Sequence, residues 1–126
     1  LMIEAIQEHV QTICGEVSHG DRGDDAPGRV LTRKDRAFLD GNIRKLEEEG
    51  SSVRGFRLPG GSEVSAFIDI ARTGARRAER SMVELNEQNA KLNANFLVYL
   101  NRLSTLLYIM AGRYDPASGV SARSGK

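Results

Sequence analysis

The densest cluster of charge in the sequence lies in residues 71–80, which hold Arg72, Arg76, Arg77, Glu79 and Arg80. On a helix, Arg72, Arg76 and Glu79 follow one line, and Arg80 comes one turn after Arg76. Like charges at this spacing repel, so the pattern favours an anion between them, and guanidinium groups donate forked hydrogen bonds that suit phosphate oxygens. Glu79 could hold one arginine in orientation. The alternative is a solvated helix face with ordinary intrahelical ion pairs.

A second group of polar side chains lies in residues 99–108. Asn101 and Arg102 follow one another, and Thr105 shares the helical face of Asn101 with Tyr108. An asparagine beside a helix seam is expected to pair with the neighbouring helix.

Few other residues have the types and spacing that chemistry requires. Phe56 precedes a Leu-Pro-Gly-Gly turn and is expected to anchor that loop on the end of the bundle. His9 and His19 lack the spacing of a metal pair, so we predict no metal site. The single cysteine, Cys14, excludes an internal disulfide and a multi-cysteine zinc site, and its apolar neighbours predict a small core residue.

Four stretches have the three- and four-residue spacing of apolar side chains that indicates helices, and none alternates like a strand. The first begins almost at Leu1, without a capping residue, which suggests a chain cut from something longer. It places five apolar side chains on one face that we expect to be buried: Ile3, Ile6, Val10, Ile13 and Val17.

The other three helices carry boundary signals. Thr32 and Asp35 resemble a capping box at the start of the second helix, and Gly50 is placed to end it. Ser62 is the expected N-cap of the third helix, and the fourth starts near Asn93. The apolar seams of these two helices are Val64, Ile68, Ala71, Ala75, Ala78, Met82 and Leu85, and then Phe96, Leu100, Leu103, Leu107 and Met110. The sequence predicts an all-α antiparallel helical bundle over residues 1–114 and a flexible tail over 115–126.

Composition narrows the class of protein. The chain has 126 residues, with 18 basic and 17 acidic side chains and a net charge of +1. A nucleic-acid binder usually carries a clear basic excess, so that class is disfavoured. The apolar runs are too short for a membrane span or a signal peptide, and we expect a cytoplasmic protein without a membrane partner.

Three blocks of sequence together resemble the PduO-type ATP:cob(I)alamin adenosyltransferases, also called corrinoid adenosyltransferases. They are FRLPGGSE at residues 56–63, ARTGARRAER at 71–80 and YLNRLSTLLY at 99–108, and their order and spacing match as well. The resemblance covers roughly residues 1–114. It implies a five-helix bundle whose first helix is missing here, and a homotrimer with active sites between subunits.

The resemblance also implies a reaction and its residues. ATP gives its 5′-deoxyadenosyl group to the cobalt of cob(I)alamin, with Mg²⁺ present, and triphosphate leaves. The residues carried over as ATP contacts are Arg76, Arg77, Glu79, Arg80 and Asn101. Phe56 would face the lower side of the corrin and, with Arg76, would take part in catalysis. Arg72 and Arg102 would lie at subunit boundaries, and a cobalamin reductase or an adenosylcobalamin-dependent enzyme is a possible partner.

Two departures from the family pattern keep other functions open. The family's glycine- and threonine-rich nucleotide loop does not occur in this sequence, and Thr105 stands where an aspartate is common. One alternative is therefore a non-catalytic corrinoid- or nucleotide-binding homologue. Another is a helical interaction module whose arginines bind an acidic protein.

Overall fold

The computed structural model describes residues 2–19, 30–50, 62–88 and 92–114, and all four helices lie in these ranges. They are α1 (Met2–His19), α2 (Arg33–Glu48), α3 (Glu63–Glu87) and α4 (Asn95–Arg113). Within these ranges there is no strand, and the all-α antiparallel bundle is confirmed. None of these helices is long and apolar enough to cross a membrane.

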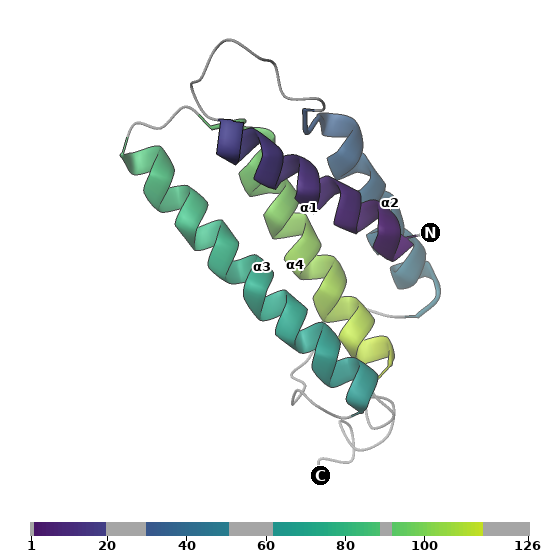
Figure 1. Cartoon of the computed structure of the whole chain (residues 1–126). Helices are drawn as coiled ribbons and strands as arrows, with labels where there is room; N and C mark the ends of the chain where they lie inside the picture. Colours follow the sequence, from purple (N-terminus) through teal and green to yellow (C-terminus); the bar gives the residue numbers. More distant parts are fainter. Residues whose placement is uncertain (1, 20–29, 51–61, 89–91, 115–126) are drawn as a thin grey trace.

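Helix α4 is the centre of the bundle. It packs most extensively against α3 and next against α2, and Figure 1 shows α3 and α4 side by side, running in opposite directions. All five apolar positions expected to face the core from α4 are buried, and Tyr99, Leu106 and Ile109 are buried with them. Because a helix apolar on most sides must be covered on most sides, α4 takes the central position.

The helix boundaries follow the predicted signals. Thr32 and Asp35 form a complete capping box at α2, and Gly50 follows the helix with a φ of 101°, a conformation that glycine adopts without strain. Ser62 accepts a hydrogen bond from the backbone of Ser65 and donates one of 2.7 Å to the carbonyl of Tyr114. The second bond ties the start of α3 to the end of α4.

Helix α4 begins slightly later than its expected cap. Ala94 occupies the N-cap position without a side-chain hydrogen bond, but the Asn93 Oδ1 atom accepts a bond of 2.9 Å from the backbone N–H of Asn95. Asn93 therefore satisfies one of the free N–H groups at the helix start.

The buried face of α1 differs from the expected one. Ile6 and Ile13 are in the core, but Ile3, Val10 and Val17 are exposed. The helix is rotated about its axis so that His9 and Thr12 are buried instead. The rotation has a chemical reason, because partners for the imidazole lie inside the bundle.

Those partners form a buried polar network between three helices. The His9 Nδ1 atom lies 2.8 Å from the Tyr99 hydroxyl, and its Nε2 atom lies 3.2 Å from the Asp35 Oδ1 atom. A neutral imidazole satisfies both contacts when Nε2 carries the proton, because the carboxylate accepts and the tyrosine hydroxyl donates. The network joins α1 to α2 and to the central helix α4.

Helix α3 buries less of its apolar seam than expected. Ala75 and Met82 are buried, and Ile68, Ala78 and Leu85 are partly buried against the core, but Val64 and Ala71 are exposed. Phe67 and Ile70 are exposed as well. Only one stripe of α3 therefore touches the bundle.

Candidate functional site

The polar residues predicted from the second and third sequence blocks meet where α3 packs against α4. The Asn101 Nδ2 atom donates a hydrogen bond of 3.2 Å to the Glu79 Oε2 atom. Asn101 thus pairs with the neighbouring helix, as the sequence predicted. Because both groups lie at the surface, this bond orients the two side chains and leaves them accessible to a ligand.

A second contact joins the same two helices farther along. The Arg72 Cζ atom lies over the ring of Tyr108, 5.3 Å from its centroid. This is within the range of a cation–π interaction, which is stronger where the cation is shielded from water. The Arg72 Nε atom is shielded from water in this way. It has no hydrogen-bond partner within the part of the chain that the structure describes.

These two contacts fix the register of α3 against α4 along the line where the two helices meet, which we call the α3–α4 seam. Arg72 lies opposite Tyr108 and Glu79 opposite Asn101, as expected for antiparallel helices. Arg76 comes four residues after Arg72 and three before Glu79, so it lies on the same side of α3, between the two contacts. The line of charge expected from the sequence therefore runs beside α4.

The arginines of α3 have no carboxylate partner within the part of the chain that the structure describes. Among the described residues, Arg72, Arg76, Arg77 and Arg80 have no acidic partner at salt-bridge distance, and Glu79 is bonded to Asn101 instead. The intrahelical ion pairs of the alternative expectation are not formed among the described residues, but Arg76, Arg77 and Arg80 are exposed, as on a solvated helix face. The anion site on these arginines therefore stays a prediction. Guanidinium groups without a carboxylate partner, such as those of Arg76 and Arg80 one turn apart on the exposed side of α3, are suited to an oxyanion.

Two neighbours on α4 have bonds within the chain. The Arg102 Nε atom lies 3.0 Å from the Asp40 Oδ1 atom of α2. The Thr105 hydroxyl donates to the carbonyl of Asn101. The side chain of Thr105 thus bonds to its own helix and offers no charge to an arginine.

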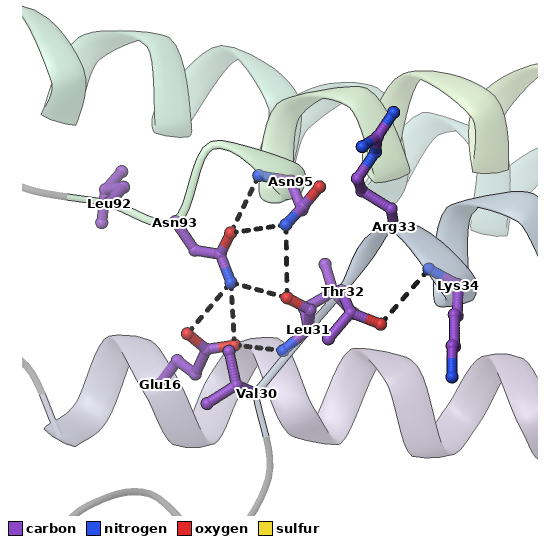
Figure 2. A pocket seen from close by; sticks show the side chains of 9 residues that line it. All are labelled: Glu16, Val30, Leu31, Thr32, Arg33, Lys34, Leu92, Asn93 and Asn95. Atoms are coloured by element: carbon purple, nitrogen blue, oxygen red, sulfur yellow. Dashed lines mark hydrogen bonds between the residues drawn. The ribbon is translucent and has the colours of Figure 1, made fainter.

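A pocket lies at the opposite end of the bundle from the Ser62–Tyr114 contact. It has a volume of about 800 Å³ and is lined by Glu16 and by residues around the starts of α2 and α4. Figure 2 shows its polar groups bonded to one another: Glu16 accepts from the Leu31 N–H at 2.6 Å and from the Asn93 amide, which also donates to the Leu31 carbonyl. Because these groups form their hydrogen bonds with one another, their role is to hold three segments of the chain together. The α3–α4 seam is therefore the candidate site.

The comparisons with known proteins identify the family of the chain. A family model described as cobalamin adenosyltransferase matches residues 1–114. The chain belongs to this family. The resemblance drawn from the three sequence blocks is confirmed.

Relatives in the cobalamin adenosyltransferase family are similar over much of the chain. A cobalamin adenosyltransferase of Cupriavidus metallidurans is 50% identical over 117 residues, covering 92% of this chain and 59% of that protein. A corrinoid adenosyltransferase of Bacillus subtilis is 37% identical over 90 residues, 71% of this chain and 46% of the relative. The corrinoid adenosyltransferase PduO of Salmonella typhimurium is 30% identical over 114 residues, which cover 90% of this chain and 34% of that protein. The chain thus spans about half the length of these relatives, or less.

Other residues considered from the sequence fall outside the seam. Phe56 lies outside the described residues. Cys14 is exposed, so the expectation of a core cysteine is wrong, because the rotation of α1 turns it outward. Among the described residues no group of three or more histidine, cysteine or acidic side chains could hold a metal ion. The placement of Arg72 and Arg102 at subunit boundaries stays a prediction.

Sequence reasoning missed Tyr108 and His9 as interacting residues. The sequence pattern placed Tyr108 on the face of Asn101 but indicated no partner for it. Tyr108 also follows Leu100 and Ser104 at four-residue spacing, which puts it on a face that can contact a neighbouring helix, and it contacts Arg72 of α3. His9 was considered only as a metal ligand. A signal did exist, because a histidine within an apolar helix needs hydrogen-bond partners when it is buried.

Proposed function

We propose that this protein transfers the 5′-deoxyadenosyl group of ATP to the cobalt of cob(I)alamin, releasing triphosphate. Membership of the cobalamin adenosyltransferase family supports a corrinoid substrate. The observation that carries the proposal is the row of uncompensated arginines on α3 beside the Glu79–Asn101 hydrogen bond. A polyphosphate is a ligand that such a surface suits.

The reaction needs positioning more than acid–base catalysis. The cobalt of cob(I)alamin supplies the electron pair that forms the Co–C5′ bond, and the C5′–O bond breaks with its electrons leaving on triphosphate. No general base is needed. The role left to this chain is to hold the leaving group in line and to stabilise its growing negative charge, which is a major part of many enzymatic accelerations.

Each residue of the seam has its own role in holding the substrate. Arg76 and Arg80 bind phosphate oxygens, with Arg77 about 100° around the helix from Arg76 and so less directly placed. Asn101 contacts the nucleotide. Glu79 holds the Asn101 amide in place and orients an arginine or a metal-bound water.

The seam could bind Mg²⁺ only together with the substrate, whose phosphate oxygens would supply further ligands. Glu79 is the carboxylate of the seam, and Mg²⁺ sites of phosphate-transferring proteins commonly use one or two carboxylates plus phosphate oxygens and water. Bound there, Mg²⁺ would neutralise part of the charge on the phosphates.

Further parts of the proposal concern the assembly. Residues 1–114 act as the adenosyltransferase domain of a cytoplasmic homotrimer, with Arg72 and Arg102 at subunit boundaries. Phe56 covers the lower face of the corrin, where an apolar ring excludes water and favours the four-coordinate cob(II)alamin that can be reduced. A cobalamin reductase or an adenosylcobalamin-dependent enzyme is the expected protein partner.

The test is an adenosylation assay on the full-length protein, with cob(I)alamin and ATP followed by the absorbance of adenosylcobalamin. Arg76→Ala should weaken ATP binding roughly 10- to 150-fold, because a hydrogen bond to a charged group contributes about 1.5–3 kcal/mol. Arg44→Ala is the matched control, since Arg44 is an exposed arginine of α2 away from the seam.

The outcomes separate the function from the site. A parent protein that binds ATP and corrinoid without forming adenosylcobalamin would refute the transferase activity. A parent protein that is active, with an Arg76→Ala variant as active as Arg44→Ala, would refute the site and leave the activity standing.

A further inference from the structure

The contact between Arg72 and Tyr108 differs from the other arginine contacts of the bundle. Arg102 and Arg113 each lie within 3.0 Å of a carboxylate oxygen, which neutralises their charge. Arg72 is held by an aromatic ring instead. A ring fixes the position of a guanidinium group without cancelling its charge.

The Arg72 Nε atom adds a second observation. It is shielded from water, and in the described part of the chain no acceptor bonds to it. A buried donor without a partner is costly and rare in native proteins. The guanidinium therefore retains both its charge and its hydrogen-bonding capacity for an acceptor that these two helices do not supply.

The ring also sets where this charge lies. In the antiparallel register, the Arg72–Tyr108 contact is two helical turns from the Glu79–Asn101 bond, and Arg76 lies between them on α3. Without the ring, a long arginine side chain would lose its preferred position among many rotamers. Tyr108 thus controls one end of the row of guanidinium groups.

We propose that Tyr108 is a positioning residue, whose ring holds the uncompensated Arg72 guanidinium at the α3–α4 seam for an oxyanion that completes the site. This inference rests on the proposed function. The oxyanion is either a phosphate oxygen of ATP or a carboxylate of a second copy of the chain. Both sources share the chemistry that a guanidinium recognises.

The experiment uses four variants of the full-length protein: Tyr108→Leu, Tyr108→Phe, Arg72→Met and the double variant Arg72→Met/Tyr108→Leu. Calorimetric titration with MgATP measures the dissociation constant, and sedimentation measures the association state. Tyr114→Leu is the control for loss of an exposed aromatic ring from the same end of α4.

Tyr108→Leu should weaken either MgATP binding or self-association roughly 2- to 30-fold, the range that corresponds to a cation–π contact. A change in the MgATP constant identifies the phosphate as the oxyanion, and a change in self-association identifies the carboxylate. Tyr108→Phe should retain the parent value, because phenylalanine keeps the ring. In the Arg72→Met background, Tyr108→Leu should have no further effect.

Three results would overturn the proposal. Tyr108→Phe could lose as much as Tyr108→Leu, which would assign the effect to the hydroxyl. Tyr108→Leu could act equally strongly without Arg72, which would make its role a structural one. Tyr108→Leu could change neither constant. A parent that binds no MgATP refutes the proposed function separately, and the sedimentation arm still tests Tyr108.

Discussion

Replacing Asp35 by alanine should destabilise the protein more than replacing Thr32, the other residue of the capping box at the start of α2. The carboxylate has two roles, one with each oxygen. Its Oδ2 atom accepts the backbone N–H of Thr32 at 2.9 Å in the capping box, and its Oδ1 atom lies 3.2 Å from the His9 Nε2 atom. Capping a helix and holding α1 in place thus depend on one side chain.

The magnitude follows from these two contacts. Losing a capping residue costs about 0.5–2 kcal/mol, and losing a hydrogen bond to a charged group costs about 1.5–3 kcal/mol. Because the His9–Asp35 contact is buried, solvent screens it little. The Asp35→Ala variant should therefore lose about 2–5 kcal/mol of the free energy of unfolding. Thr32→Ala, which affects only the cap, should lose about 1 kcal/mol.

Urea denaturation at pH 7, followed by circular dichroism, measures both values. A double-mutant cycle with His9→Ala isolates the contact between the two helices, and its coupling free energy should be about 1.5–3 kcal/mol. A coupling below about 0.5 kcal/mol, or equal losses for Asp35→Ala and Thr32→Ala, would refute the second role of Asp35.

Three further predictions concern the core, a helix interior and the corrin. Leu39→Ala should lower the free energy of unfolding by about 2–5 kcal/mol in urea denaturation, because Leu39 is 0% exposed, and a loss below about 1 kcal/mol would contradict its core position. Gly15→Ala should raise the same quantity by about 0.5–1 kcal/mol, since no atom lies within 4 Å of the added methyl group, and a lower melting temperature would count against it. Phe56→Ala should keep the ATP affinity but impair adenosylation that starts from cob(II)alamin, and unchanged spectra of four-coordinate cob(II)alamin would disprove that role.

Sequence pattern predicted the helices and the residues of the seam because both depend on local spacing. Capping residues act on backbone groups two or three positions away, so Thr32 and Ser62 were found correctly. Asn101 and Glu79 lay on predictable helical faces, and antiparallel packing of two consecutive helices brings such faces together. The family resemblance supplied the chemistry that spacing alone did not.

The rotation of α1 could not be predicted in the same way. Its apolar spacing favoured a face with Ile3, Val10 and Val17, whereas the observed face includes His9. The difference depends on Tyr99 and Asp35, which lie far along the chain. Hydrophobic periodicity ranks faces by apolar area and does not include hydrogen-bond partners supplied by other helices.

The central position of α4 has a consequence for synthesis on the ribosome. Among the described residues, most of the buried apolar side chains belong to α4, which emerges after α1, α2 and α3. The His9–Tyr99 contact spans 90 residues and the Glu16–Asn93 contact 77, against 22 for Glu79–Asn101. A nascent chain that ends before α4 would therefore carry three amphipathic helices with their apolar faces uncovered, as targets for chaperones. When α4 appears, its hairpin with α3 should close first, because a shorter loop loses less entropy, and α1 and α2 should dock afterwards.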